Sequence, residues 1–211
     1  MHILNKHFDK IYVLTMENSF RIERMKERLQ GIDYEFFYGV NGATLDKTPY
    51  IEKGSKQTRG QLGCTISHIN IYNKIFNEKL YNNILILEDD MVFSDNLNKL
   101  DDYMNQLPQD WGLFYLGWDG GAGAYPNYSA NLCEISNNSL YTMHCTHAIA
   151  IRPWFAQKAI ETNINFHFTA DGNLTETVKQ HNLKAYAALP KLINPDNMES
   201  ITCNIDKEYG F

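Results

Sequence analysis

The sequence has little of what a nucleic-acid-binding or membrane-spanning protein requires. Lys and Arg number 19 against 25 Asp and Glu, which gives a formal net charge of -6 at pH 7. Neutralising the phosphates of a nucleic acid requires a concentrated basic face, so we expect no nucleic-acid partner. The longest apolar runs, such as 84–87 and 148–151, are far shorter than the roughly 20 residues that cross a bilayer, so we expect no transmembrane segment. The first residues also lack the apolar stretch of a signal peptide.

Common metal and nucleotide motifs are missing as well. The cysteines Cys64, Cys133, Cys145 and Cys203 form no C-x-x-C pair, and we find no histidine at ligand spacing from them that would indicate a zinc knuckle. We therefore expect reduced structural thiols. Neither G-x-x-x-x-G-K-[ST] nor G-x-G-x-x-G after the first strand occurs, which argues against P-loop and dinucleotide-binding proteins. An anionic ligand would have to be held by a few placed cations or by a metal.

What the sequence does contain is an alternation of short apolar segments and amphipathic ones. This pattern is typical of an α/β protein in which helices flank a mostly parallel sheet. We predict strands at 10–16, 34–40, 84–87, 113–116, 146–151 and 184–188, and helices at 19–29, 60–80, 96–105, from 153, and at 170–181. The polar stretch 43–59 has no clear periodicity, so we expect a loop that is either a flap over a site or an insertion. No repeat or linker divides the chain, and we expect one domain over residues 1–211.

Three acids, Glu88, Asp89 and Asp90, follow the apolar run 84–87 without an intervening turn. Open α/β sheets bind ligands beyond the carboxyl ends of their strands. Adjacent acids there repel one another and lose hydration, and a divalent cation would offset that cost by binding their oxygens. Spacing alone leaves open a second interpretation, in which the acids cap the following segment or pair with surface lysines.

Several motifs, in this order, resemble glycosyltransferase family 25. They are KIYVLTM at 10–16 with Arg21 and Arg24 shortly after, YEFFYGVNG at 34–42, RGQLGCTISH at 59–68, LILEDD at 85–90 and THAIAIRP at 146–153. That family includes bacterial lipopolysaccharide and lipooligosaccharide sugar transferases and is similar to the collagen galactosyltransferases. The resemblance implies a GT-A-like, Rossmann-like fold, a UDP-hexose donor carrying galactose or glucose, and Mn²⁺ or Mg²⁺. It also implies a glycan or glycolipid acceptor and a cytoplasmic enzyme, with peripheral association at the inner face of a membrane.

The resemblance also assigns roles to individual residues. It implies that Glu88 and Asp90 bind the metal, and the donor-binding residues that it implies are Thr15, Arg21, Arg24, Asn41, Gly42, Gln61, Ser67, His68 and Asp89. Each assignment has a structural alternative. A solvated charged helix face explains the two arginines, close packing explains the small residues between 60 and 67, and a single histidine is often a hydrogen-bonded structural residue.

Transfer with inversion needs a general base that takes the proton of the acceptor hydroxyl. Asp171 in TADGNL is our preferred residue and Asp119 in GWDGG the reserve. Asp171 begins a predicted helix, where aspartate is also an ordinary capping residue, and Asp119 would equally suit a solvent-exposed loop. Three aromatic residues flank the glycine-rich segment 117–123 and would either stack on an acceptor sugar or pack in the protein; they are Trp118, Tyr125 and Tyr128.

Some positions depart from the family pattern. Gln61 stands where the family usually has Glu, Asn41 where it has Asp, Thr15-Met16 where it has Asn-Leu, and Ile22 where it has the second arginine of an early pair. Each change removes or softens a polar group near the expected donor pocket. They motivate a second hypothesis, a non-catalytic carbohydrate-binding protein on the same scaffold. A third is a metal-dependent phosphohydrolase that uses the three acids, although no nucleophile motif for it is evident.

Overall fold

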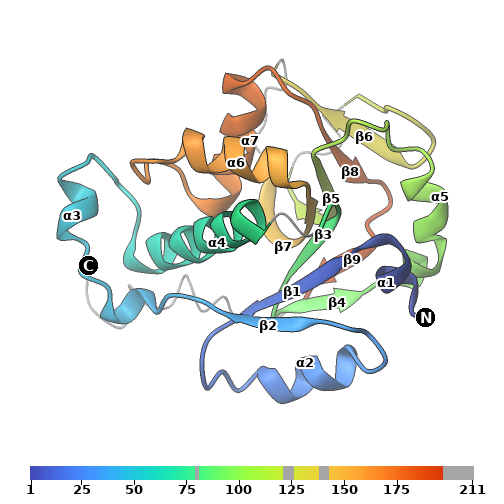
Figure 1. Ribbon diagram of the computed structural model, residues 1–211, viewed down its shortest axis with the longest axis horizontal. Helices are drawn as coiled ribbons and strands as arrows, with labels where there is room; N and C mark the ends of the chain where they lie inside the picture. Colours follow the sequence, from blue (N-terminus) through green and yellow to red (C-terminus); the bar gives the residue numbers. More distant parts are fainter. Residues whose placement is uncertain (79–80, 121–125, 138–142, 197–211) are drawn as a thin grey trace.

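The computed structural model describes residues 1–78, 81–120, 126–137 and 143–196. Its main strands are β1 Lys10–Thr15, β2 Glu35–Tyr38, β3 Ile84–Glu88, β5 Leu113–Asp119, β6 Leu132–Ile135, β7 His144–Ile151 and β8 Ala185–Ala188. They form one seven-stranded sheet with the order β2-β1-β3-β7-β5-β8-β6 (Figure 1). Two further strands, β4 Met91–Phe93 and β9 Ile193–Pro195, pair antiparallel in a separate ribbon.

The sheet is mixed, but most of its strands run in one direction. β1 is parallel to β2 and β3, β5 is parallel to β8, β7 is antiparallel to both β3 and β5, and β6 is antiparallel to β8. Five of the seven strands, β1, β2, β3, β5 and β8, therefore share a direction, and β7 and β6 oppose them. The predicted α/β architecture with a mostly parallel, Rossmann-like sheet is confirmed. The carboxyl ends of β1, β3 and β5 lie at one edge, where the amino end of β7 also lies.

Helices cover both faces of this sheet (Figure 1). One face carries α4 Arg59–Glu78, α6 Pro153–Thr162 and α7 Ala170–Gln180, and the other carries α1 Ile3–His7, α2 Ile22–Arg28 and α5 Leu100–Met104 together with the β4–β9 ribbon. Shorter helical segments are η1 Gly42–Thr44, α3 Thr48–Ile51 and η2 Asp95–Lys99. In the part of the chain that the structure describes, no helix has both the length and the apolar character needed to cross a membrane.

The continuous apolar run of β3 follows from its burial on both faces. Ile84 and Ile86 belong to the core cluster that contains residues of α4, whereas Leu85 and Leu87 belong to the cluster that contains residues of α1 and α2. Successive side chains of a strand point to opposite faces, so a strand that is covered on both faces is apolar at every position. The same alternation continues at the end of β3. It directs the side chain of Glu88 towards α4 and the side chain of Asp89 towards α2.

Several elements differ from the sequence prediction. α2 begins at Ile22 instead of Ser19, because residues 19–21 turn towards the end of β3. The stretch 43–59 contains η1 and α3, and Gln57 is buried and donates to the Phe166 carbonyl at 2.8 Å, so this stretch docks on the loop before α7. β5 runs on through Gly117 to Asp119, and residues 121–123 of the predicted glycine-rich loop and the end of the predicted helix at 79–80 lie outside the described residues. α1, β4, β6 and β9 were not predicted, because they are short and β4, β6 and β9 pair with strands distant in sequence.

Gly42 marks a close contact between the loop after β2 and the start of α4. A Cβ at Gly42 would lie 2.3 Å from the Arg59 carbonyl oxygen, and a Cβ at Gly63 would lie 2.9 Å from the Gly42 Cα. We expect Gly42→Ala to lower the free energy of unfolding by about 1–3 kcal/mol, the usual range for overpacking, because a backbone atom cannot move aside as a side chain can. Urea denaturation would measure this. Gly172→Ala is the control, since its Cβ would meet side-chain atoms; an equal loss in both variants would contradict the prediction.

Candidate active site at the carboxyl edge of the sheet

Asp89 binds the loop between β1 and α2. Its carboxylate accepts hydrogen bonds from Thr15 Oγ1 at 2.6 Å, from Ser19 Oγ at 3.1 Å and from Arg21 Nη1 at 2.9 Å. Thr15, Arg21 and Asp89 are all buried. Three residues that the sequence assigned to donor binding are therefore brought together, and in this arrangement they bind one another. Ser19 was expected only as a helix cap.

Asp90 lies in the turn directly after Asp89. Its Oδ2 is 3.6 Å from Arg21 Nη1, and its Oδ1 is buried with no hydrogen-bond partner among the described residues. Burial raises the pKa of Asp90, the negative charge of Glu88 raises it further and Arg21 opposes the rise, which leaves it at about 7. Buried carboxylate oxygens without a partner are rare in folded proteins and call for an explanation such as a bound ion. The oxygen set of Asp90 and Glu88 therefore suits a hard divalent cation.

Glu88 faces α4 and is held from two sides. Its Oε1 accepts a hydrogen bond from Thr146 Oγ1 at 2.6 Å and lies 2.9 Å from His68 Nε2. Burial by itself would raise the pKa of Glu88, but the hydrogen bonds and the charge of His68, with the hydrogen bond from Thr146, outweigh burial and lower that pKa. Glu88 is therefore ionised at neutral pH. Thr146 was missed as a site residue, although it opens the motif THAIAIRP.

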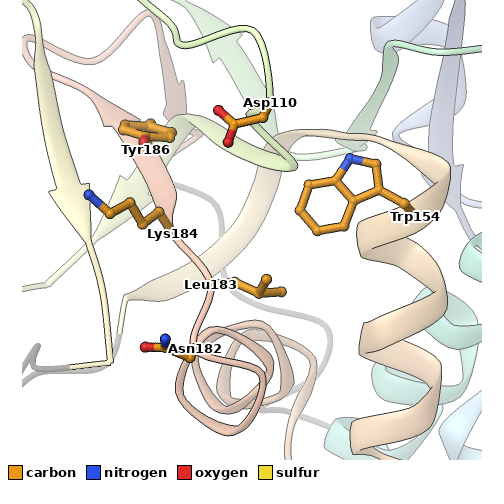
Figure 2. A pocket seen from close by; sticks show the side chains of 6 residues that line it. All are labelled: Asp110, Trp154, Asn182, Leu183, Lys184 and Tyr186. Atoms are coloured by element: carbon orange, nitrogen blue, oxygen red, sulfur yellow. The ribbon is translucent and has the colours of Figure 1, made fainter.

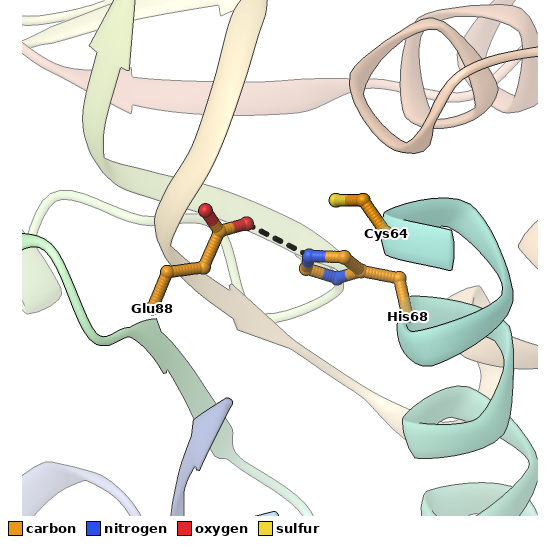
Figure 3. A group of neighbouring side chains, drawn as sticks. All are labelled: Cys64, His68 and Glu88. Atoms are coloured by element: carbon orange, nitrogen blue, oxygen red, sulfur yellow. Dashed lines mark hydrogen bonds and ion pairs between the residues drawn. The ribbon is translucent and has the colours of Figure 1, made fainter. Parts of the chain in front are cut away.

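Cys64 approaches Glu88 from the same helix as His68 (Figure 3). The Cys64 sulfur, a His68 ring nitrogen and a Glu88 carboxylate oxygen all lie within 4.8 Å of one another. Burial and the negative charges of Glu88, Asp171 and Asp90 raise the pKa of the Cys64 thiol well above its ordinary value. The sequence interpretation that no histidine stands at ligand spacing from a cysteine was wrong, because residues four apart share one face of a helix.

Arg24 is ion-paired with Asp196, the residue that follows β9. It is 3.1 Å from the carboxylate of Asp196, which also accepts a hydrogen bond from Arg28 Nη2 at 2.6 Å. The hydrogen bond from Arg28, with the charges of both arginines, lowers the pKa of Asp196. The backbone amide of Asp196 in turn donates to the carbonyl of Asp90. Arg24 therefore takes part in the ion pairs of Asp196, the residue after β9. Asp196 in turn holds the Asp90 turn through its backbone amide.

The two candidate bases flank His144, the first residue of β7. Asp171 Oδ1 accepts hydrogen bonds from Thr169 Oγ1 at 2.6 Å and from the Gly172 amide at 2.9 Å, and its Oδ2 lies 3.4 Å from His144 Nδ1. Asp119, the last residue of β5, stands opposite His144 in the sheet and is exposed. The N-cap of α7 is Thr169, so Asp171 takes part in the cap and still directs one oxygen towards the sheet edge. His144 was not predicted to be near the site.

Comparison with known proteins identifies the family. Residues 8–148 match the profile described as Glycosyltransferase family 25 (LPS biosynthesis protein), which covers more than half of the chain. The chain belongs to glycosyltransferase family 25. It is 32% identical over 130 residues to Procollagen galactosyltransferase 1-A of Xenopus laevis, covering 52% of this chain and 21% of that protein. It is 27% identical over 230 residues to Procollagen galactosyltransferase 2 of Homo sapiens, covering 89% of this chain and 35% of that protein.

Other relatives extend this comparison. The Probable inactive glycosyltransferase 25 family member 3 of Rattus norvegicus is 28% identical over 135 residues, with 52% of this chain and 23% of that protein covered. This family 25 chain thus spans about a third or less of the length of these relatives. Among solved structures, A197 from STIV gives a TM-score of 0.47 at 13% identity, with 90% of this chain and 94% of that chain covered. Similarity at this level does not bear on the chemistry of the site.

Three further residues were expected at the donor site of this family 25 chain. Their side chains form hydrogen bonds with nearby backbone amides. Asn41 caps η1 with a 2.9 Å hydrogen bond, and Ser67 Oγ accepts from the Val40 amide at 2.8 Å. Gln61 Oε1 accepts from the Thr58 amide at 3.0 Å while Thr58 Oγ1 accepts from the Gln61 amide at 3.2 Å. This is a capping box, which glutamine completes as well as glutamate does. The departure at Gln61 therefore leaves the start of α4 intact, and the close approach of Gly42 and Gly63 accounts for the small residues along α4 by packing.

The two described aromatic residues near the glycine-rich segment, Trp118 and Tyr128, have different surroundings. Trp118 is buried, donates from Nε1 to the Ala188 carbonyl at 2.8 Å, and has the Lys191 ammonium 4.5 Å from its ring centroid, so it packs in the core. Tyr128 is partly exposed and meets Tyr186 edge-on at 4.8 Å between centroids. Tyr125 lies outside the described residues. The structure therefore does not support Trp118 as a residue that stacks on the acceptor sugar.

A cavity of about 220 Å³, whose lining side chains are drawn in Figure 2, includes none of the residues of the Glu88–Asp90 turn. It is lined by Asp110, Trp154, Asn182, Leu183, Lys184 and Tyr186. These residues lie near the amino ends of β5 and β8 and the carboxyl end of β7, so the cavity opens at the sheet edge opposite the carboxylates. None of the residues that the sequence assigned to catalysis, donor or metal lines it. The cavity therefore lies at the edge opposite the one where ligands of open α/β sheets bind.

Proposed function

We propose that this family 25 chain transfers a hexose, galactose or glucose, from a UDP-sugar to a hydroxyl of a glycan or glycolipid acceptor. We further propose surface glycan or lipopolysaccharide synthesis at the inner face of a membrane as the setting. The family description, which names LPS biosynthesis, supports the lipopolysaccharide part, and the relatives named as galactosyltransferases support galactose as the sugar. One observation carries the proposal. A buried oxygen of Asp90, without a hydrogen-bond partner among the described residues, lies just after the carboxyl end of a central strand, beside an ionised Glu88 and a buried arginine.

Asp90 and Glu88 are the residues that would hold Mn²⁺ or Mg²⁺. Oxygen ligands from carboxylates suit both ions, and the unpartnered Oδ1 of Asp90 supplies a ligand atom that has no other role within the described residues. A bound cation would neutralise the charge that develops on the leaving diphosphate. Arg21 adds a fixed positive charge next to Asp90. Asp89 acts indirectly, because its hydrogen bonds with Arg21 and Thr15 hold that guanidinium in place.

We assign the general base to Asp171. Its Oδ1 is fixed by the Thr169 hydroxyl and the Gly172 amide, which leaves Oδ2 as the atom that can take a proton from the acceptor hydroxyl. His144 Nδ1 lies 3.4 Å from this Oδ2. Asp119 remains the reserve, because it lies across the sheet from the same histidine but is exposed.

The base assignment makes a quantitative prediction. Asp171→Asn should lower kcat for UDP release by about 100-fold and leave the donor KM nearly unchanged, because the amide cannot accept a proton but contacts the donor no differently. Steady-state assays over a range of donor concentrations measure both constants. Asp119→Asn is the matched control, expected to change kcat by less than about threefold. The reverse ranking of the two variants would transfer the assignment to Asp119.

A donor panel tests the proposed function as a whole. The purified protein is incubated with UDP-galactose, UDP-glucose and other UDP-sugars plus Mn²⁺, and UDP release is followed with and without a chelator. The proposal predicts slow, metal-dependent hydrolysis of one donor in water and faster release with an acceptor glycan. Release of phosphate from simple monoesters would instead favour the phosphohydrolase. Sugar binding without any UDP release would favour the non-catalytic protein, a state that the name of the rat relative gives for that protein.

A further inference from the structure

Cys64 and His68 are two potential metal ligands on the same helix, α4. The four-residue spacing places both on the face of the helix that meets the end of β3. Figure 3 shows the sulfur and the imidazole directed towards the Glu88 carboxylate, and the three ligand atoms lie within 4.8 Å of one another. His68 Nε2 is the closest, at 2.9 Å from Glu88 Oε1. A thiol, an imidazole and a carboxylate thus converge from two different elements of the fold.

We propose that Cys64, His68 and Glu88 form a binding site for a thiophilic divalent cation, Zn²⁺ or Co²⁺, distinct from the hard-cation site at Asp90. Zinc accepts sulfur, nitrogen and carboxylate oxygen together, with water as a fourth ligand. Bond lengths of about 2.0–2.3 Å put the ligand atoms of a tetrahedral zinc about 3.5 Å apart. Side-chain movements of about 1 Å would therefore close the observed arrangement around an ion.

The surroundings of His68 support a ligand role. The imidazole is buried, and its other nitrogen, Nδ1, lies 3.5 Å from the hydroxyl of the buried Tyr72. Histidines that bind metals generally have the second ring nitrogen held by a polar partner, which fixes the ring orientation. Glu88 is in turn oriented by Thr146 at 2.6 Å. Two of the three ligand side chains are therefore already positioned by neighbouring hydroxyls.

Ligand chemistry separates this site from the one proposed for the sugar donor. Sulfur and imidazole ligands select zinc or cobalt, whereas carboxylate oxygens suit magnesium and manganese. Glu88 belongs to both sets, so an ion at Cys64 and His68 would compete with the hard cation for that carboxylate. Arg21 of the donor site is hydrogen-bonded to Asp89, whose side chain points to the face of the sheet opposite Glu88. The thiophilic site can therefore be tested without any sugar nucleotide.

Cobalt provides the direct test. Titrating the whole apo protein with Co²⁺ should give one site per chain, with a near-ultraviolet thiolate-to-cobalt charge-transfer band and the visible bands of a tetrahedral complex. Cys64→Ser and Cys64→Ala should both lose the charge-transfer band. Cys145→Ser is the matched control, because Cys145 is a half-buried thiol at the same sheet edge that does not belong to the ligand group. It should keep the band.

Two further measurements keep the proposal falsifiable if a variant folds poorly. Zn²⁺ should raise the Tm of the native chain and of Cys145→Ser, and leave that of Cys64→Ser unchanged, because an ion that binds only the folded state stabilises it. Asp90→Asn should retain the cobalt band, which separates this site from the donor site. A band that persists in Cys64→Ser, or that disappears in Cys145→Ser instead, would overturn the proposal. Loss of donor hydrolysis alone would bear on the transferase and not on this site.

Discussion

Asp90→Asn is expected to lower the rate of UDP release from the preferred donor by at least about 1,000-fold. A catalytic cation contributes several kcal/mol of transition-state stabilisation, and each 1.36 kcal/mol corresponds to a tenfold change in rate. The substitution keeps the size of the side chain but removes its charge and replaces one of its two oxygens by an amide NH₂ group, at a side chain whose Oδ1 is buried and has no partner among the described residues. The rate should not recover when Mn²⁺ is increased to millimolar concentration.

The control for this experiment is Asp102→Asn. Asp102 is exposed on α5, on the opposite face of the sheet from α4 and α7. Its replacement should change the rate by less than about twofold, since a surface charge away from the site adds little. A fully active Asp90→Asn protein would remove the central argument of the proposed function. The unfolding transition of both variants should be measured, and Asp90→Asn should be at least as stable as the native chain, because it no longer buries a carboxyl group near two other acids.

Asp89→Ala is expected to lower the free energy of unfolding by about 3–5 kcal/mol. Asp89 and Arg21 are ion-paired at 2.9 Å with 9% and 3% of their side chains exposed. Removing one partner of a buried pair is costly because the remaining charge is less well compensated, and Asp90 at 3.6 Å is a more distant partner for Arg21 than Asp89. Thr15 and Ser19 would lose their acceptor at the same time. Urea denaturation followed by far-ultraviolet circular dichroism measures the change.

Two controls separate this cost from general effects of losing an acid. Glu23→Ala breaks the exposed Glu23–Lys26 pair, which lies on α2 close to Arg21, and should cost at most about 0.5 kcal/mol. The double substitution Arg21→Met with Asp89→Leu should recover most of the stability, because apolar residues of similar volume can replace a buried pair. If Asp89→Ala were as mild as Glu23→Ala, the Asp89 carboxylate would not be the anchor that the structure shows. Its predicted role would then lie in contacts with the donor.

The sequence was most informative where the physical signal is local. The apolar run of β3 and the spacing of apolar residues along α4 predicted those elements closely, because burial on two faces of a strand or on one face of a helix leaves a period that can be counted. Short strands were missed because they contain too few residues to show such a period. β4 and β9 have three residues each and owe their existence to pairing across about 100 residues of chain.

The candidate active site shows more clearly what the sequence could not predict. Three acids in a row are visible in the sequence, and their place after a buried strand indicated a ligand site. The sequence could not tell that Asp89 would bind Arg21, that Glu88 would bind His68, or that an oxygen of Asp90 would have no partner among the described residues. The capping box at Gln61 was missed, although Thr58 three residues earlier completes its sequence signature.

By itself the amino-acid sequence determined the layers of this protein, the family to which it belongs and the strand end at which its acids gather. Only the tertiary structure decided what each acid does. Neighbouring side chains at a strand end point to opposite faces of the sheet, so each acid meets a different set of partners. Those partners, from Thr15 to Thr146, come from segments that are distant along the chain and adjacent only after folding.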